Sequence, residues 1–87
     1  MCEKIIKIIA LYEFLIYVEN RKVYKDILNK YKKVMLNISD GNIKKEHFDP
    51  LLNVFRLFFE AIPSDDVLAK YIIDKMQEFY EDYSQIE

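Results

Sequence analysis

The spacing of apolar residues along the chain predicts helices. Between residues 22 and 39, apolar side chains recur every three or four positions, which is the period of one face of an α-helix. These positions are Val23, Ile27, Tyr31, Val34 and Ile38. A second stripe with the same period lies between residues 64 and 83. It consists of Leu68, Ile72, Met76, Phe79 and Tyr83. We therefore predict helices over residues 22–39 and 64–83, each with one buried face.

Two further segments are apolar on most sides. Residues 3–19 are apolar nearly all round, which predicts a buried helix. In residues 49–61 the polar side chains Asn53, Arg56 and Glu60 form one narrow stripe. We predict a third helix over residues 49–61, with Asp49 as its N-cap and Pro50 at its first position. This helix must be buried on most sides or present an apolar patch to a partner.

The connections between these segments contain residues that favour turns and helix ends. Asn20 is suited to a left-handed position after the first helix, and Gly41 to the end of the second. Ser64 is a plausible N-cap for the fourth helix. Tight connections favour antiparallel neighbours. The predicted architecture is therefore all-α, an antiparallel up-down four-helix bundle in a single domain over residues 1–87.

Composition supports a small helical domain. The chain has 87 residues, of which 52% are hydrophobic, but only one Gly and two Pro, too few for the many turns of a small β-domain. The single cysteine cannot form an intrachain disulfide. The most apolar stretch, residues 5–18, is shorter than the roughly 20 residues that a membrane span requires. We therefore expect a cytoplasmic protein.

Charge is distributed unevenly along the chain. Residues 1–47 carry a formal charge of +4 and residues 48–87 a charge of −6. Four lysines lie on the side of the second helix opposite its apolar stripe: Lys22, Lys25, Lys32 and Lys33. This basic face is either an ordinary solvated surface or a contact for an anionic partner or a membrane surface. A sequence pI of about 5.4 argues against a dedicated nucleic-acid binder, so we expect no nucleic-acid partner.

Candidate catalytic groups do not form a recognisable constellation. The only histidine, His47, lies in a charged loop, and Cys2 has no activating neighbour. Asp65 and Asp66 diverge by about 100° on a helix and are better explained as helix-start charges than as metal ligands. We therefore predict that the protein is not an enzyme and has no cofactor or metal.

The order of certain residues resembles a known family. The blocks are Tyr24-Lys25-Asp26-Ile27-Leu28, Lys33-Val34-Met35-Leu36, Asp49-Pro50-Leu51-Leu52-Asn53 and Leu57-Phe58-Phe59-Glu60-Ala61. In this order they are similar to the enterocin A immunity family, which confers resistance to pediocin-like (class IIa) antimicrobial peptides. The resemblance covers roughly residues 20–80. A composition rich in Lys, Ile, Asn and Tyr is also typical of a low-GC Gram-positive source.

The resemblance implies a four-helix bundle and a protective function. Members of this family protect a bacteriocin producer by recognising, from the cytoplasm, the complex of the toxin with the mannose phosphotransferase permease. Specificity in the family lies mainly in the C-terminal half. We therefore expect partner contacts at Arg56, Glu60, Asp65, Asp66, Tyr80, Glu81 and Asp82, and membrane association through the partner.

Three alternatives stay open. Tyr80 lies about 100° from the core stripe and is either packed at its edge or a contact residue. The protein is either a monomer or a weak homodimer. A small helical adaptor that dimerises through the apolar surface of the third helix is the main alternative function, followed by a nucleic-acid binder that uses the basic face.

Overall fold

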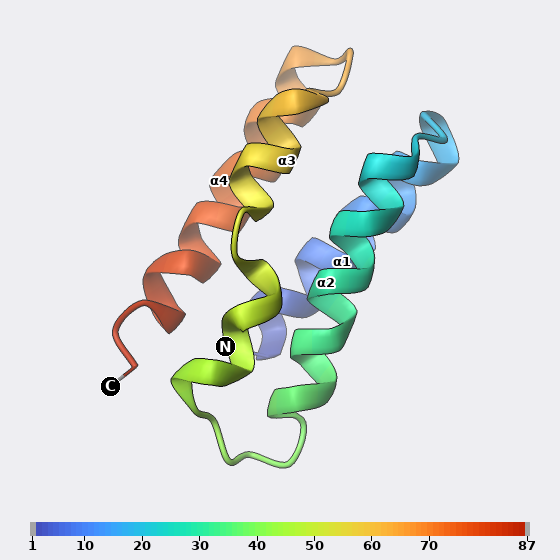
Figure 1. Ribbon diagram of the computed structural model, residues 1–87. Coiled ribbons are helices and arrows are strands. Elements are labelled where there is room, and N and C mark those ends of the chain that lie inside the picture. The colour runs from blue at the N-terminus through green and yellow to red at the C-terminus, as the bar shows by residue number, and fades with distance from the viewer. Residues whose placement is uncertain (1, 87) are drawn as a thin grey trace.

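The computed structural model describes residues 2–86 and is helical throughout its regular structure (Figure 1). The α-helices are α1 (Cys2–Val18), α2 (Lys22–Ile38), α3 (Val54–Glu60) and α4 (Asp66–Tyr83). A 3-10 helix, η1 (Lys45–Leu51), precedes α3. Within residues 2–86 there is no β-strand. Met1 and Glu87, the two ends of the predicted domain, lie outside the described residues.

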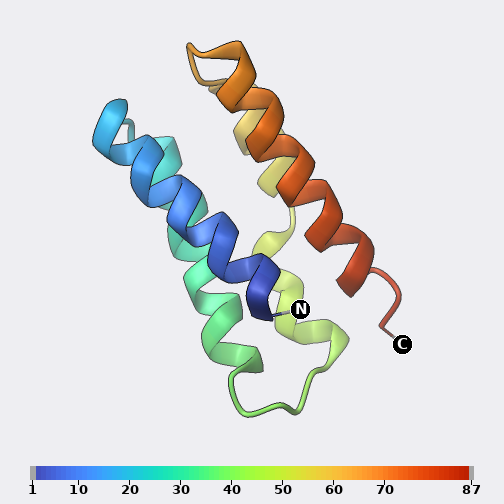
Figure 2. The same ribbon diagram turned by 180° about the vertical axis from the view of Figure 1, so that it is seen from behind.

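The helices pack side by side into an elongated body of 37 × 21 × 19 Å (Figures 1 and 2). Helix α2 packs against α1 on one side and against η1 and α3 on the other, and α1 also packs against α4. The start of α1 lies at the end of α4, where Lys4 Nζ is 2.9 Å from Asp82 Oδ2. At the other end, the backbone N–H and Oγ of Ser64 each donate a hydrogen bond of 3.1 Å to the Glu19 carboxylate.

The predicted stripes of α2 and α4 form the centre of the core. All residues of the α2 stripe are buried except Val23, which is half-buried. In α4, Ile72, Met76 and Phe79 are buried, and the two end members of the stripe are half-buried. Phe79 is a central contact, because its ring lies 6.1 Å from the Tyr31 ring and 6.0 Å from the Phe48 ring. Periodicity therefore identified both faces correctly.

Helix α1 is less buried than expected. Its buried residues form one face: Ile5, Ile8, Ile9, Tyr12 and Leu15. Its other side exposes the large apolar side chains Ile6, Phe14, Tyr17 and Val18. The expectation of a buried helix is wrong for this side, because the main neighbours of α1 among residues 2–86 are α2 and α4, and two neighbours shield part of a helix surface.

The prediction of one continuous helix over residues 49–61 is wrong, because two helical elements occupy this range. Residues 45–51 form η1, so Asp49 lies inside a helix and is not an N-cap, and the N-cap of α3 is Asn53. Pro50 lies inside η1. The chain then passes through Asn53 in the left-handed conformation, with φ of 69°. A spacing of three matches the period of a 3-10 helix, which buries Phe48 and Leu51 together.

Two predicted turn details also differ from the structure. The N-cap of α4 is Asp65, whose side chain accepts from the Leu68 N–H at 3.0 Å, because the polar groups of Ser64 are engaged by Glu19. Asn20 is not left-handed, and Asn53 is the non-glycine residue with positive φ among residues 2–86. Gly41 follows α2 with φ of 80°, as expected for the end of that helix.

Candidate interaction surfaces

The two groups considered for catalysis come from different elements, Cys2 from α1 and His47 from η1. His47 Nδ1 accepts from the Lys44 backbone N–H at 3.2 Å, and Cys2 is exposed at the start of α1. Among residues 2–86, no group of three or more His, Cys, Asp or Glu side chains is placed to hold a metal ion. None of the helices described has both the length and the apolar character needed to cross a membrane.

The basic face of α2 is fully accessible. Lys22, Lys25, Lys32 and Lys33 are exposed, and none forms an ion pair with a described residue. The tyrosines of the same helix, Tyr24 and Tyr31, are buried on its opposite side. This face therefore offers positive charge without exposed aromatic rings on which bases could stack.

An open groove runs between α2 and the η1–α3 segment. Its walls carry charges of both signs and two asparagine side chains. The lining residues are Asp26, Asn29, Lys30, Lys33, Asn37, Glu46, Asp49, Pro50 and Leu57. The Asn37 side-chain amide donates to the His47 carbonyl oxygen at 3.1 Å and so holds η1 against α2. The mixed charge of the groove does not select an anionic or a cationic ligand.

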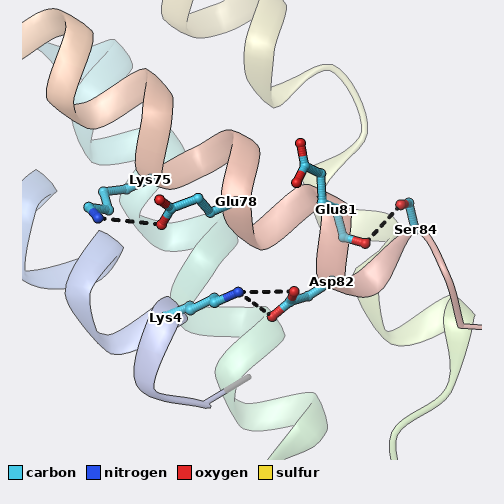
Figure 3. Close-up of polar contacts among 6 residues, drawn as sticks. All are labelled: Lys4, Lys75, Glu78, Glu81, Asp82 and Ser84. Atoms are coloured by element: carbon cyan, nitrogen blue, oxygen red, sulfur yellow. Dashed lines mark hydrogen bonds and ion pairs between the residues drawn. The ribbon is translucent and has the colours of Figure 1, made fainter.

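The expected partner residues are spread along the length of the molecule. Asp65 and Asp66 lie at the start of α4, and Glu81 and Asp82 lie near its end, about 24 Å along the helix axis. Asp82 is engaged by Lys4, whose pKa is raised by that hydrogen bond (Figure 3). The Glu81 carbonyl accepts from Ser84 Oγ, while its carboxylate points away from these contacts (Figure 3).

Arg56 and Glu60 form a separate, weak pair on α3. Their closest charged atoms are 3.9 Å apart, and both side chains are more than 60% exposed. An exposed pair of this kind contributes little to stability, about 0.3–0.5 kcal/mol on a helix. Both groups therefore remain accessible to a partner.

Tyr80 lies beside an aromatic hollow between η1 and the end of α4. The hollow has a volume of about 220 Å³ and is lined by Lys45, Phe48, Asp49, Leu52, Tyr80, Tyr83 and Ser84. The Phe48 and Tyr83 rings stack at 4.7 Å, and the edge of Tyr80 meets Tyr83 at 5.3 Å. Burial raises the pKa of Tyr83 to about 12. Tyr80 itself is 42% exposed, so it is both an edge-packing residue and an accessible one.

Periodicity pointed to Tyr80 and missed the residues that η1 contributes to this hollow. Phe48 lies in η1 and Leu52 directly follows it, in a segment for which the sequence predicts part loop and part α-helix. The spacing of Phe48 and Leu51 was the available signal, because three residues per turn predicts a 3-10 helix with both on one side. Leu52 is 69% exposed and extends the apolar rim of the hollow.

Exposed apolar side chains are concentrated towards one end of the molecule. They come from the C-terminal half of α1, from the connection between α3 and α4, and from the elements on either side of it. The residues are Phe14, Tyr17, Val18, Phe59, Ile62, Val67 and Tyr71. The hydrogen bonds between Glu19 and Ser64 hold the two helix connections at this end together. A concentration of exposed apolar side chains is typical of an interaction surface.

Buried tyrosines belong to the core and not to a site. The Tyr12 hydroxyl donates to Met76 Sδ at 3.1 Å, and the Tyr24 hydroxyl has no hydrogen-bond partner among the described residues. Burial raises the pKa of Tyr12, Tyr24 and Tyr31. These hydroxyls therefore stay protonated at neutral pH.

Comparison with known proteins gives no match, either to a protein family, to a curated protein or to a solved structure. The resemblance to the enterocin A immunity family therefore stands on the order of the residue blocks in this chain.

Proposed function

We propose that this protein is a bacteriocin immunity protein that acts in the cytoplasm without catalysis. The observation that carries the proposal is the ordered set of blocks from Tyr24-Lys25-Asp26-Ile27-Leu28 to Leu57-Phe58-Phe59-Glu60-Ala61. The all-helical packing is compatible with it. In this proposal the protein recognises the complex of a pediocin-like peptide with the mannose phosphotransferase permease and blocks leakage through it.

The architecture that we propose is an antiparallel up-down four-helix bundle, in which η1 and α3 together take the third position. It is supported by the ion pair of Lys4 with Asp82 and by the hydrogen bonds of Ser64 to Glu19, which join opposite ends of the molecule's first and last helices. In such a bundle α3 and α4 form a hairpin whose outer surface is free for a partner.

The proposed contact surface includes the rim of the aromatic hollow. Tyr80 and Leu52 combine apolar area with accessibility, and Glu81, which follows Tyr80 on α4, adds a carboxylate that forms no ion pair with a described residue. Large, partly exposed aromatic residues are the side chains that most often dominate binding at an interface. The hollow also lies in the half of the chain to which the family resemblance assigns specificity.

Expression in a strain sensitive to class IIa peptides tests the function. We expect the strain to survive at least one member of a panel of such peptides that kills the same strain carrying an empty vector. Unchanged killing by every peptide, in cells where the protein is present and helical, would refute the proposed function.

Two variants at exposed apolar side chains test the contact surface. Tyr80→Ala removes a ring from the rim of the hollow, and Ile6→Ala removes a 55% exposed apolar side chain near the start of α1, outside both candidate surfaces, as a control. We expect protection to fall for Tyr80→Ala and to persist for Ile6→Ala, with circular dichroism verifying that both variants are folded. Equal protection by both would exclude Tyr80 from the contact.

A helical adaptor that forms a homodimer is the second candidate. Phe59 is 59% exposed on α3, and an exposed aromatic side chain there fits a dimer contact. Phe55 offers less, because it is half-buried and its ring meets Tyr80 edge-on at 5.9 Å. A dimer that dissociates on Phe59→Ala, in a protein that gives no protection against any peptide, would favour this function.

A further inference from the structure

The outer faces of α2 and α4 are complementary to each other. Along α2, exposed residues recur at spacings of three, four, three and four, and along α4 at four, three, four and three. A spacing that alternates between three and four residues is that of the a and d positions of a heptad repeat, which face the partner helix in a coiled coil. When the helices are aligned antiparallel, the two sets meet in five layers. The layers pair Lys22 with Glu81, Lys25 with Glu78, Asn29 with Asp74, Lys32 with Tyr71, and Leu36 with Val67.

Each layer joins compatible chemistry. Two layers pair a lysine with a glutamate, and one places a lysine on the Tyr71 ring, where a cation–π contact is favourable. The layer at one end pairs Leu36, 72% exposed, with Val67, 81% exposed. No layer pairs like charges, because the exposed face of α2 is mainly basic and that of α4 is mainly acidic.

The two faces cannot meet within one molecule. The buried sides of α2 and α4 face each other through the core, where the Tyr31 and Phe79 rings are 6.1 Å apart. The outer faces therefore point in opposite directions, as the diagonal placement of the two helices in both ribbon views indicates (Figures 1 and 2). The helix that docks on either face must therefore belong to another molecule.

We propose that copies of this chain associate head to tail, the α2 face of one copy docking antiparallel on the α4 face of the next. Because the two faces differ and point in opposite directions, each added copy leaves one of each face free, so the association is open-ended. A single helix pair falls below the roughly 1,200 Å² of a stable interface, so the association is weak and reversible.

Groups already present on α4 allow this docking. The Glu78 carboxylate forms an ion pair of 3.4 Å with Lys75 of the same helix, yet the Glu78 side chain is 49% exposed (Figure 3). Lys75 Nζ also lies 5.2 Å from the Tyr71 ring centre, and the Lys75 side chain is 25% exposed. Lys70, the other cation of this segment, is exposed one residue away from Tyr71. The incoming lysines share these acceptors with Lys75, which keeps the affinity low.

Sedimentation of the full chain over a concentration series up to about 1 mM measures the association. At about 0.01 M salt, where the electrostatic screening length is about 30 Å, we expect the weight-average mass to rise with protein concentration above that of the monomer. At about 1 M salt, where this length is about 3 Å, we expect the mass to fall towards the monomer. A chain that stays monomeric throughout the low-salt series would overturn the proposal.

Charge reversal on either face tests which surfaces meet. We expect Lys22→Glu with Lys25→Glu, and separately Glu78→Lys with Glu81→Lys, to weaken association at least about tenfold. An equimolar mixture of the two double variants restores opposite charges at every contact, and we expect association to return. Failure of the mixture to associate would contradict the pairing of these faces.

Two further variants separate the faces from net charge and from folding. Glu3→Lys with Glu13→Lys changes the net charge in the same direction and by the same amount as Glu78→Lys with Glu81→Lys, but at exposed positions of α1, and we expect it to associate like the unmodified chain. Loss of association in this control would assign the effect to net charge and overturn the proposal. Leu36→Asp, at an exposed position, weakens association without reversing a lysine, and circular dichroism checks the helix content of every variant.

Discussion

Phe79 offers a direct test of how the core holds the helices together. The side chain comes from α4 and is fully buried. Its ring centre lies 6.1 Å from that of Tyr31 on α2, 6.0 Å from that of Phe48 on η1 and 5.3 Å from that of Tyr83. Truncation to alanine therefore removes contacts with two other segments, α2 and η1, and one contact within α4.

The expected loss is large for a chain of this size. Removing a buried phenylalanine ring costs about 3–5 kcal/mol of unfolding free energy, because the lost burial adds to the cost of the cavity that remains. A chain of 87 residues has a total stability of about 4–13 kcal/mol. Phe79→Ala should therefore remove a substantial part of the stability, and Phe79→Leu, which leaves a smaller cavity, about 1–2 kcal/mol.

Urea unfolding monitored by circular dichroism at 222 nm measures these differences, provided that the slope of the transition stays constant between variants. The matched control is Phe59→Ala, which makes the same chemical change at a side chain that is 59% exposed. We expect it to alter the unfolding free energy by less than about 0.5 kcal/mol. Equal losses for Phe79→Ala and Phe59→Ala would refute the assignment of Phe79 to the core.

Three further predictions concern the backbone, pH and the link between helix connections. Asn53 has φ of 69°, so Asn53→Ala should lose about 1 kcal/mol of unfolding free energy and Asn53→Gly less than about 0.5, as measured by urea unfolding; the reverse order would contradict a left-handed residue. Burial raises the pKa of Tyr83 to about 12, above its ordinary value near 10, so its stabilising effect is complete below about pH 10 and is lost as the pH rises through about 12. Stability of the unmodified chain should fall over that range, and less steeply in Tyr83→Phe; parallel curves would exclude Tyr83 as a source. Ser64→Ala removes one hydrogen bond to Glu19 and should cost about 0.5–1 kcal/mol in thermal or urea unfolding, whereas no loss would show that this exposed contact contributes nothing.

The predictions that succeeded depend on local repetition. Ile27, Tyr31 and Val34 are buried because a helix repeats every 3.6 residues and places them on one side. The same reasoning placed Ile72 and Met76 in the core. Periodicity says which side of a helix is apolar, and that side is buried wherever a neighbour is available.

The predictions that failed depend on which neighbours a segment has. Residues 3–19 are apolar nearly all round, which predicts a buried helix, yet Phe14 and Tyr17 are exposed because no helix among residues 2–86 covers that side of α1. Asp49 and Pro50 read as a helix start, and the chain instead forms a 3-10 helix there because it buries Phe48 and Leu51 against α2. Tertiary packing outweighed local preference at both places.

The two candidate surfaces also differ in whether the sequence alone could predict them. The basic face of α2 could be predicted from the chain, since its four lysines share one side of a single helix. The hollow beside Tyr80 could not, because its walls come from η1 and α4, which are far apart along the chain. Periodicity along one segment reports on that segment alone, whereas a surface shared by two elements depends on how they dock.

The amino-acid sequence by itself determined that this protein is helical, where α2 and α4 lie and which of their faces are buried, because these properties follow from side-chain repetition over a few turns. Only the tertiary structure decided that η1 replaces the start of the third helix, that one side of α1 stays exposed, and that Tyr80 meets Phe48 and Leu52 around one hollow. Those outcomes depend on contacts between segments distant in sequence, whose free energy exceeds the small local preferences that a single stretch of residues expresses.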